Sequence, residues 1–256
     1  METKRIDLLL LRGLAREKRH WGDFSRNLQN SFEEVNVITM DLPGLGTERL
    51  RKSPTTIDGI TDDLRARWLE CRKTENHSFL VAISLGGMVA SNWVDRFPSD
   101  FQGLVLINSS LRKFSPFWKR LRPHAMWALV KILSKTDNVF ERECEILKLT
   151  SNVHTYDEGI AQKWASYFKE SPMSYRNFFR QFIAAIRCKG LGEIMPPNLV
   201  LGSKFDRLCH YSCSEAIAKH FSGKLMLHES AGHDLPLDDP EWVIKNIHNF
   251  VLENKG

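Results

Sequence analysis

Three polar residues, each placed after a short apolar segment, have the types and the chain order that nucleophilic catalysis requires. They are Ser84, Asp206 and His233. In such a set the histidine removes the serine proton, while a buried carboxylate fixes the histidine tautomer and stabilises its cation. We therefore expect Ser84 as the nucleophile, His233 as its base and Asp206 as the acid that orients His233. Asp234 is a rival acid, but it adjoins His233 in the chain and is poorly placed to reach the far nitrogen of the same ring.

The residues around Ser84 favour a tight turn from a strand into a helix. A nucleophile elbow has the pattern Gly-x-Ser-x-Gly, because small residues on both sides let the turn approach neighbouring backbone. Here the two small residues are Ala82 and Gly86, so the first departs from the pattern but stays small. The alternative is that Ser84 simply caps the following helix. The acid and the histidine that follow in the expected order favour the catalytic interpretation.

Short apolar segments alternate with amphipathic ones in the first part of the chain. The apolar segments are continuous rather than alternating, which indicates strands buried on both faces of a parallel sheet. The alternation predicts an α/β fold with about six mainly parallel strands and helices on both faces. We expect strands at 6–11, 35–40, 79–83, 104–107, 199–201 and 225–227, and helices at 21–32, 57–72, 87–97 and 242–252.

Residues 111–190 break this alternation, with helical patterns at 117–133, 139–149, 159–168 and 175–186. Insertions in α/β folds belong at the carboxyl ends of strands, where ligands bind. We therefore expect a core formed by 1–110 and 191–256 and a lid of four helices formed by 111–190. The lid is rich in aromatic residues, of which Phe114 and Trp118 are expected to contact the substrate.

Five fragments together resemble the α/β-hydrolase superfamily, and its serine esterases in particular, over nearly the whole chain. The resemblance implies attack by Ser84 on an acyl carbonyl, with the backbone N–H groups of Leu14 and Leu85 stabilising the oxyanion. It also implies that no cofactor and no metal is needed. The fragments are LLLLRGL at 8–14, MDLPGLG at 40–46, AISLGG at 82–87, GSKFD at 202–206 and GH at 232–233.

The first of these fragments departs from the family, because Arg12 stands before Gly13 where the family usually has His-Gly. In one interpretation Arg12 and Gly13 contact the substrate, and Arg12 or Arg16 binds its carboxylate or phosphate. In the other, which we favour, Arg12 forms an internal ion pair, for instance with Glu17, that braces the oxyanion loop. Buried arginines are usually paired, and this favours the second interpretation.

The resemblance leaves the reaction open between three classes. The first is hydrolysis of a carboxylic ester or thioester through an acyl-serine intermediate. The second is a lyase of the same fold that uses the triad serine as a base, since residues 41–47 are similar to the menaquinone-pathway synthases; it needs an arginine in the pocket for an acidic substrate. The third is a receptor or scaffold that kept the fold and lost turnover.

The expected lid carries the positive charge of the chain. It holds 15 Lys and Arg against 7 Asp and Glu, whereas the remainder holds 21 against 24. This surface favours an acidic partner, and the size and layout of the chain are similar to pimeloyl-acyl-carrier-protein methyl ester esterases. We therefore expect a small-molecule or carrier-bound acyl ester, with an acyl carrier protein docking on the basic lid. Nucleic acid is disfavoured, because the rest of the chain is mildly acidic.

Composition and cysteine usage exclude several further classes of protein. Hydrophobic residues at 42% and charged residues at 26% are typical of a globular chain rather than a disordered one. The apolar run at 8–11 is too short for a membrane span or a secretory signal. The five cysteines form no CxxC pair, which favours reduced thiols without a metal site. We expect a cytoplasmic monomer or dimer.

Overall fold

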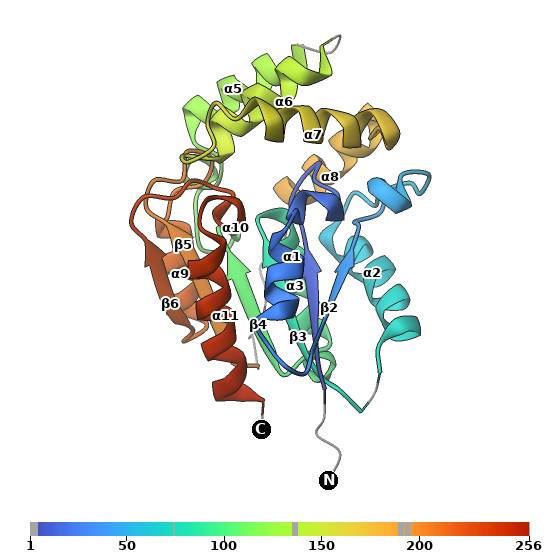
Figure 1. Ribbon diagram of the computed structural model, residues 1–256, viewed down its shortest axis with the longest axis vertical. Helices are drawn as coiled ribbons and strands as arrows, with labels where there is room; N and C mark the ends of the chain where they lie inside the picture. Colours follow the sequence, from blue (N-terminus) through green and yellow to red (C-terminus); the bar gives the residue numbers. More distant parts are fainter. Residues whose placement is uncertain (1–4, 74, 135–137, 189–191, 193–195, 256) are drawn as a thin grey trace.

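The carboxyl ends of six parallel strands lie at one edge of a single sheet (Figure 1). This computed structural model describes residues 5–73, 75–134, 138–188, 192 and 196–255. Within them the strand order is β2-β1-β3-β4-β5-β6, and each neighbouring pair is parallel, which confirms the expected sheet. The strands are β1 (Ile6–Leu11), β2 (Val35–Met40), β3 (His77–Ile83), β4 (Gly103–Ile107), β5 (Asn198–Ser203) and β6 (Lys224–His228).

Two layers of helices bury the two faces of the sheet. Alternate residues of a strand point to opposite faces, so Leu9 and Leu11 pack in one hydrophobic cluster and Leu8 and Leu10 in the other. Both faces are covered, and the central strands are therefore mostly apolar. The first cluster includes α2 (Ile57–Cys71), α3 (Leu85–Arg96) and α9 (Ser212–His220), and the second includes α1 (Phe24–Asn30) and α11 (Pro240–Asn254).

Between β4 and β5 the chain forms further helices, which lie over the carboxyl edge of the sheet (Figure 1). The described residues contain α4 (Phe117–Arg120), α5 (Pro123–Ser134), α6 (Val139–Thr150), α7 (Glu158–Glu170) and α8 (Tyr175–Arg187). The expected single helix at 117–133 is wrong. It is divided in two because Leu121 is extended and Pro123, at the start of α5, disfavours a helical Arg122.

The other departures from the expected elements are short. The expected helix at 21–32 begins later, at Phe24, because Gly22 adopts a left-handed φ of 53°. Helix α9 was not expected, since its apolar side chains are few and small. Four short helices complete the described fold: η1 (Lys18–Trp21), η2 (Gly46–Glu48), η3 (Pro98–Asp100) and α10 (Leu235–Asp238). In the described part of the chain, every helix is too short or too polar to cross a membrane.

Candidate active site

Ser84 occupies a strained turn between β3 and α3. Its φ of 58° and ψ of −120° are rare for a residue with a side chain and typically cost about 1–3 kcal/mol. Small neighbours make the turn fit: a Cβ on Gly86 would lie 2.5 Å from the carbonyl oxygen of Arg12, and one on Gly13 would lie 3.0 Å from Ser84 Cβ. The Ser84 side chain makes no capping hydrogen bond to α3, so the simple capping interpretation has no support.

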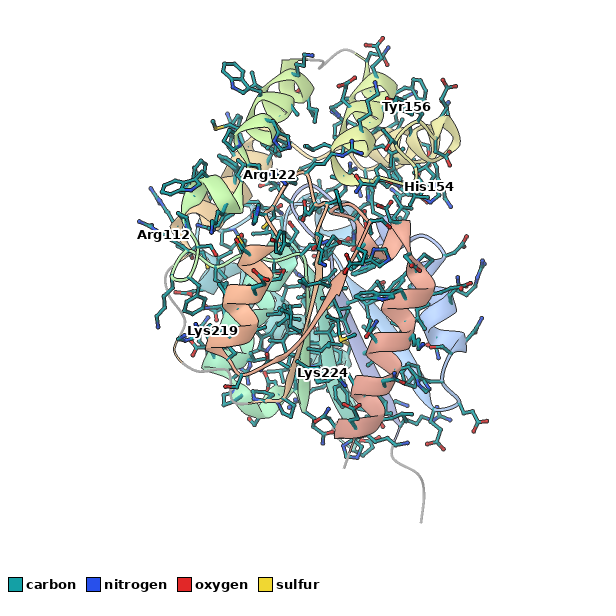
Figure 2. The ribbon with its side chains drawn as sticks, turned by 90° about the vertical axis from the view of Figure 1, so that its left-hand side faces the viewer. Arg112, Arg122, His154, Tyr156, Lys219 and Lys224 are labelled. Carbon is teal, nitrogen blue, oxygen red and sulfur yellow. The ribbon has the colours of Figure 1, made fainter. Side chains whose placement is uncertain are left out.

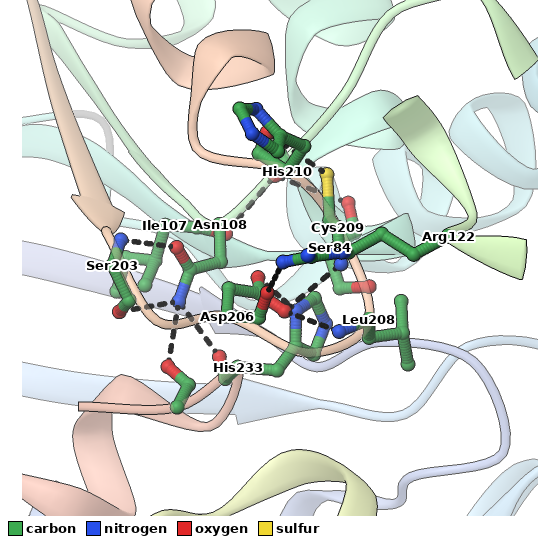
Figure 3. A network of polar contacts seen from close by, with 12 residues as sticks. Ser84, Ile107, Asn108, Arg122, Ser203, Asp206, Leu208, Cys209, His210 and His233 are labelled. Atoms are coloured by element: carbon green, nitrogen blue, oxygen red, sulfur yellow. Dashed lines mark hydrogen bonds and ion pairs between the residues drawn. The ribbon is translucent and has the colours of Figure 1, made fainter. Parts of the chain in front are cut away.

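Asp206 and His233 form a buried acid–base pair. His233 Nδ1 lies 2.6 Å from Asp206 Oδ2, and the two residues are only 6% and 1% exposed (Figure 3). The other carboxylate oxygen accepts hydrogen bonds from the backbone N–H groups of Leu208, at 2.7 Å, and Cys209, at 2.9 Å. Because both of its oxygens accept hydrogen bonds, the Asp206 carboxylate has one orientation, and in this orientation it determines the tautomer of His233.

The electrostatics of this pair favour the protonated form of His233. Burial lowers the pKa of His233, but the charge of Asp206 and the hydrogen bond to it raise the pKa by more. Asp234 adds to the increase and Arg12 opposes it. The pKa of His233 therefore lies above its ordinary value, and the surroundings stabilise the imidazolium that forms when a histidine accepts a serine proton.

Ser84 and His233 line the same cavity, which has a volume of about 190 Å³. No hydrogen bond joins the two side chains in the part of the chain that the structure describes. This is common in enzymes without bound substrate, where catalytic hydrogen bonds tighten only in the complex. The arrangement brings the nucleophile and the base to one cavity, and the acid contacts the base.

The backbone donors expected at the oxyanion are at the same place. Leu14 and Leu85 line the cavity on either side of Ser84. Among the described residues, neither backbone N–H donates to a protein acceptor. Leu85 is also the first residue of α3, where the helix dipole favours negative charge. Two unused donors beside a nucleophile can stabilise an oxyanion.

Asn108, directly after β4, connects the loops that carry the acid and the histidine (Figure 3). Its Nδ2 donates to the His233 carbonyl at 2.9 Å and lies 3.0 Å from Ser203 Oγ, while its Oδ1 accepts from the Ser203 N–H at 2.8 Å. Its φ is 42°. The sequence analysis missed this residue. The signal it gives is a lone amide at the end of a buried strand, next to the strand that carries Ser84.

The aromatic residues expected at the substrate lie elsewhere. Phe114 stacks on His220 at the end of α9, with ring centroids 4.1 Å apart. Trp118 is 64% exposed. Successive residues of a helix point about 100° apart, so when Phe117 faces the cavity Trp118 faces solvent. The helices contribute these apolar residues to the cavity instead: Phe117, Leu121, Leu129, Ile132, Ile146, Leu149, Phe178, Phe182, Ala185 and Ile186.

Arg12 makes a buried ion pair, but not with Glu17. Its Nη1 and Nη2 lie 3.0 Å and 2.5 Å from the two carboxylate oxygens of Asp234, which is why Asp234 does not compete for His233. Glu17 pairs with Arg19 instead. Arg12 lines the cavity together with Gly13 and also stacks on Trp21, with its guanidinium carbon 4.9 Å from the ring centroid. The pair braces the Arg12–Gly13 turn against the histidine loop.

No metal-binding cluster of three or more His, Cys, Asp or Glu occurs among the described residues. In the segment 209–213 two cysteines flank a histidine. Cys209 and Cys213 are free and buried, and His210 Nδ1 lies 2.9 Å from Ser212 Oγ. The interaction with Cys213 raises the pKa of the Cys209 thiol, and burial raises it further.

Several known proteins are similar to this chain in sequence. A sequence model of the alpha/beta hydrolase family matches residues 8–246. Human monoacylglycerol lipase ABHD6 is 24% identical, over 95% of this chain and 74% of the lipase. A pimeloyl-[acyl-carrier protein] methyl ester esterase from Wigglesworthia glossinidia brevipalpis is 29% identical over 41% of this chain and 37% of the esterase.

Solved structures give the same fold. A putative lipase, lip1, from Acinetobacter baumannii AYE superposes with a TM-score of 0.77 and 21% identity, over 99% of this chain and 85% of that one. The esterase RhEst1 from Rhodococcus sp. ECU1013 gives 0.75 and 18%, over 98% and 91%. With a family match that spans nearly all of its length, the chain belongs to the alpha/beta hydrolase family.

Proposed function

We propose that this protein is a serine hydrolase that cleaves carboxylic esters through an acyl-serine intermediate. The observation that carries the proposal is the buried Asp206–His233 pair beside the strained Ser84 turn, on one cavity. The named relatives are lipases and esterases, and this supports ester hydrolysis in general. The segment 111–190 would serve as a lid, because its helices supply the apolar wall of the cavity.

The reaction follows from the positions of these groups. Ser84 Oγ attacks the ester carbonyl while His233 takes its proton, and the N–H groups of Leu14 and Leu85 hold the oxyanion. Collapse of this intermediate breaks the ester bond, and His233 returns the proton to the departing alcohol. Water then attacks the acyl-serine with the same base, which releases the carboxylic acid and restores Ser84. Asp206 stays ionised throughout and stabilises the His233 cation.

The substrate could also be held on an acyl carrier protein, as the basic segment 111–190 suggests. Two exposed cations close to α4 in the chain are Arg112, which precedes this helix, and Lys119, which lies within it. Figure 2 shows Arg112 at the outer surface and Arg122 between the helices and the sheet. Arg122 is not available for docking, because its Nη1 donates to the Asp206 carbonyl at 2.9 Å.

Docking is tested by reversing the two exposed charges. Arg112→Glu with Lys119→Glu should lower kcat/KM for an acyl-carrier-protein substrate about tenfold or more and leave a small ester unchanged. The matched control is the same pair changed to Gln, which should give a smaller loss on the carrier substrate. Equal losses on both substrates would contradict docking.

The proposed hydrolysis is tested by covalent labelling with a fluorophosphonate. The wild type should be labelled at Ser84, and Ser84→Ala or His233→Ala should abolish labelling and the hydrolysis of short p-nitrophenyl esters. Circular dichroism of both variants serves as the folding control. Turnover of an acidic substrate without acylation would favour the lyase. Folded wild-type protein that is neither labelled nor active would favour the receptor, and the proposal would fail.

A further inference from the structure

Three arginines line the cavity, and two of them are neutralised by buried carboxylates. Arg12 pairs with Asp234, and Arg16 Nη1 lies 2.7 Å from Glu143 Oε2. Both carboxylate side chains are nearly inaccessible to solvent, at 6% and 4% exposed. The strand-loop side of the cavity therefore presents little net charge to a substrate. The third arginine, Arg120 at the end of α4, differs.

Arg120 has no carboxylate partner among the described residues. Its Nη2 donates to the Ala185 carbonyl at 2.8 Å and lies 3.9 Å from Met88 Sδ, and its Nε lies 3.4 Å from Ser110 Oγ. Burial lowers the pKa of Arg120, and the remaining groups that act on it are three cysteine thiols and another arginine. The groups that contact the guanidinium directly, Ser110 Oγ, Met88 Sδ and the Ala185 carbonyl, are neutral, so no carboxylate among them balances its charge.

An unpaired cation in a mostly apolar cavity raises the free energy of the protein unless an anion binds to it. Nη1 and the second proton of Nη2 have no acceptor among the described residues, and a guanidinium presents such a pair to both oxygens of a carboxylate. Ser84, Met88 and Arg120 line the same cavity, so a substrate that reaches the nucleophile is also exposed to the guanidinium.

We propose that Arg120 binds an acidic group of the substrate, so that the preferred ester carries a carboxylate on a short acyl chain, which a cavity of about 190 Å³ can hold. The proposal rests on the proposed function and deepens it by naming the substrate class: the hemiester of a short dicarboxylic acid. The competing explanation is structural, because Arg120 also caps the last turn of α8 through Ala185. A cap would serve charged and uncharged substrates equally.

Two esters of equal length separate these explanations. Mono-(4-nitrophenyl) glutarate carries the carboxylate, and 4-nitrophenyl pentanoate is its neutral counterpart. The wild type should prefer the glutarate ester. Arg120→Met should lower kcat/KM for this ester by about 10- to 100-fold, which is the effect expected from losing a hydrogen bond to a charged group. The pentanoate ester should change by less than about threefold, and Arg120→Lys should recover part of the loss.

The matched control is Arg176→Met, at an exposed arginine of α8 that lies away from the cavity lining, which should leave both esters unchanged. Equal losses on both esters in Arg120→Met, or no wild-type preference for the glutarate ester, would overturn the proposal. Thermal unfolding shows whether the variants fold.

A binding measurement keeps this result separate from the proposed hydrolysis. In Ser84→Ala protein, which cannot form an acyl-enzyme, monomethyl glutarate should bind at least tenfold more tightly than methyl pentanoate by calorimetry. Adding Arg120→Met should remove the difference. If fluorophosphonate labelling fails but this difference is found, the hydrolase proposal fails and the anion site stands. If labelling succeeds and the difference is absent, the hydrolase stands and the anion site fails.

Discussion

The two walls of the cavity are built from different parts of the chain and by different means. The wall formed by the strand ends is a network of polar contacts: Asn108, Asp206, His233 and the Arg12–Asp234 pair fix one another within the sheet edge. The wall formed by α4, α5, α6 and α8 is mostly aliphatic and aromatic. The strand-end wall can fix the positions of the reacting groups, and the helical wall can adapt to the shape of an acyl chain.

This difference assigns separate tasks to the two walls. Hydrogen bonds are directional, so a network with both oxygens of Asp206 occupied admits one geometry of the acid–base pair. Apolar packing is non-directional and roughly proportional to area. Changes in the first wall should therefore alter the chemical step, and changes in the second should alter which substrates bind. Arg120 is the exception, a charge supplied by the helical wall.

The largest expected effect comes from neutralising the acid. Asp206→Asn should lower kcat about 10⁴-fold on a short p-nitrophenyl ester, because the amide no longer stabilises the His233 cation or fixes its tautomer. The matched change is Asp234→Asn on the next residue after His233. It should lower kcat about tenfold at most, while removing about 3–5 kcal/mol from the free energy of unfolding, because Arg12 is left buried without its partner.

Steady-state kinetics and urea denaturation measure both variants. Both residues belong to the strand-end wall, so a loss of rate in one variant and of stability in the other would separate the catalytic part of that wall from its structural part. If Asp234→Asn lost as much activity as Asp206→Asn, the assignment of Asp206 as the acid would be contradicted.

The pH profile should show a smaller effect of the same network. Only neutral His233 can accept the serine proton, and Asp206 raises the pKa of His233. The value of kcat/KM on an uncharged ester should therefore rise with pH, and the midpoint of this rise should lie above about 6.5. Below the midpoint the rate should fall about tenfold per pH unit. In Asp206→Asn the residual activity should have a lower midpoint, because burial and Arg12 then lower the pKa of His233 against the smaller contribution of Asp234 alone. An unchanged midpoint would show that another group controls the profile.

The sequence predicts the polar wall better than the helical one. Strands buried on both faces leave continuous apolar runs, and the residues that follow them must meet at one edge, so Ser84, Asp206 and His233 could be proposed together. The sequence could not predict which residues form ion pairs when they lie far apart in the chain. Arg12 and Asp234 are 222 residues apart, and nothing local distinguishes Asp234 from Glu17 as the partner.

The same limit explains why the sequence predicts neither the role of Asn108 in the strand-end wall nor that of Phe117 in the helical wall. The role of Asn108 depends on two loops that begin far along the chain. Phe117 and Trp118 are adjacent and equally aromatic, and which of them faces the cavity depends on the rotation of α4, which starts after Pro116 and ends before Pro123. A hydrophobic pattern over so short a helix does not fix that rotation.

That adjacent pair offers the mildest and most specific test of the helical wall. Phe117→Ala should raise KM about tenfold for an eight-carbon p-nitrophenyl ester and leave the acetate ester nearly unchanged, since a lost apolar contact is worth about 1–3 kcal/mol and only the longer chain reaches it. Trp118→Ala removes a larger side chain that is 64% exposed, and should change neither. A loss of kcat on both esters in Phe117→Ala would mean that the helical wall also positions the reacting groups, and the division between the two walls would not hold.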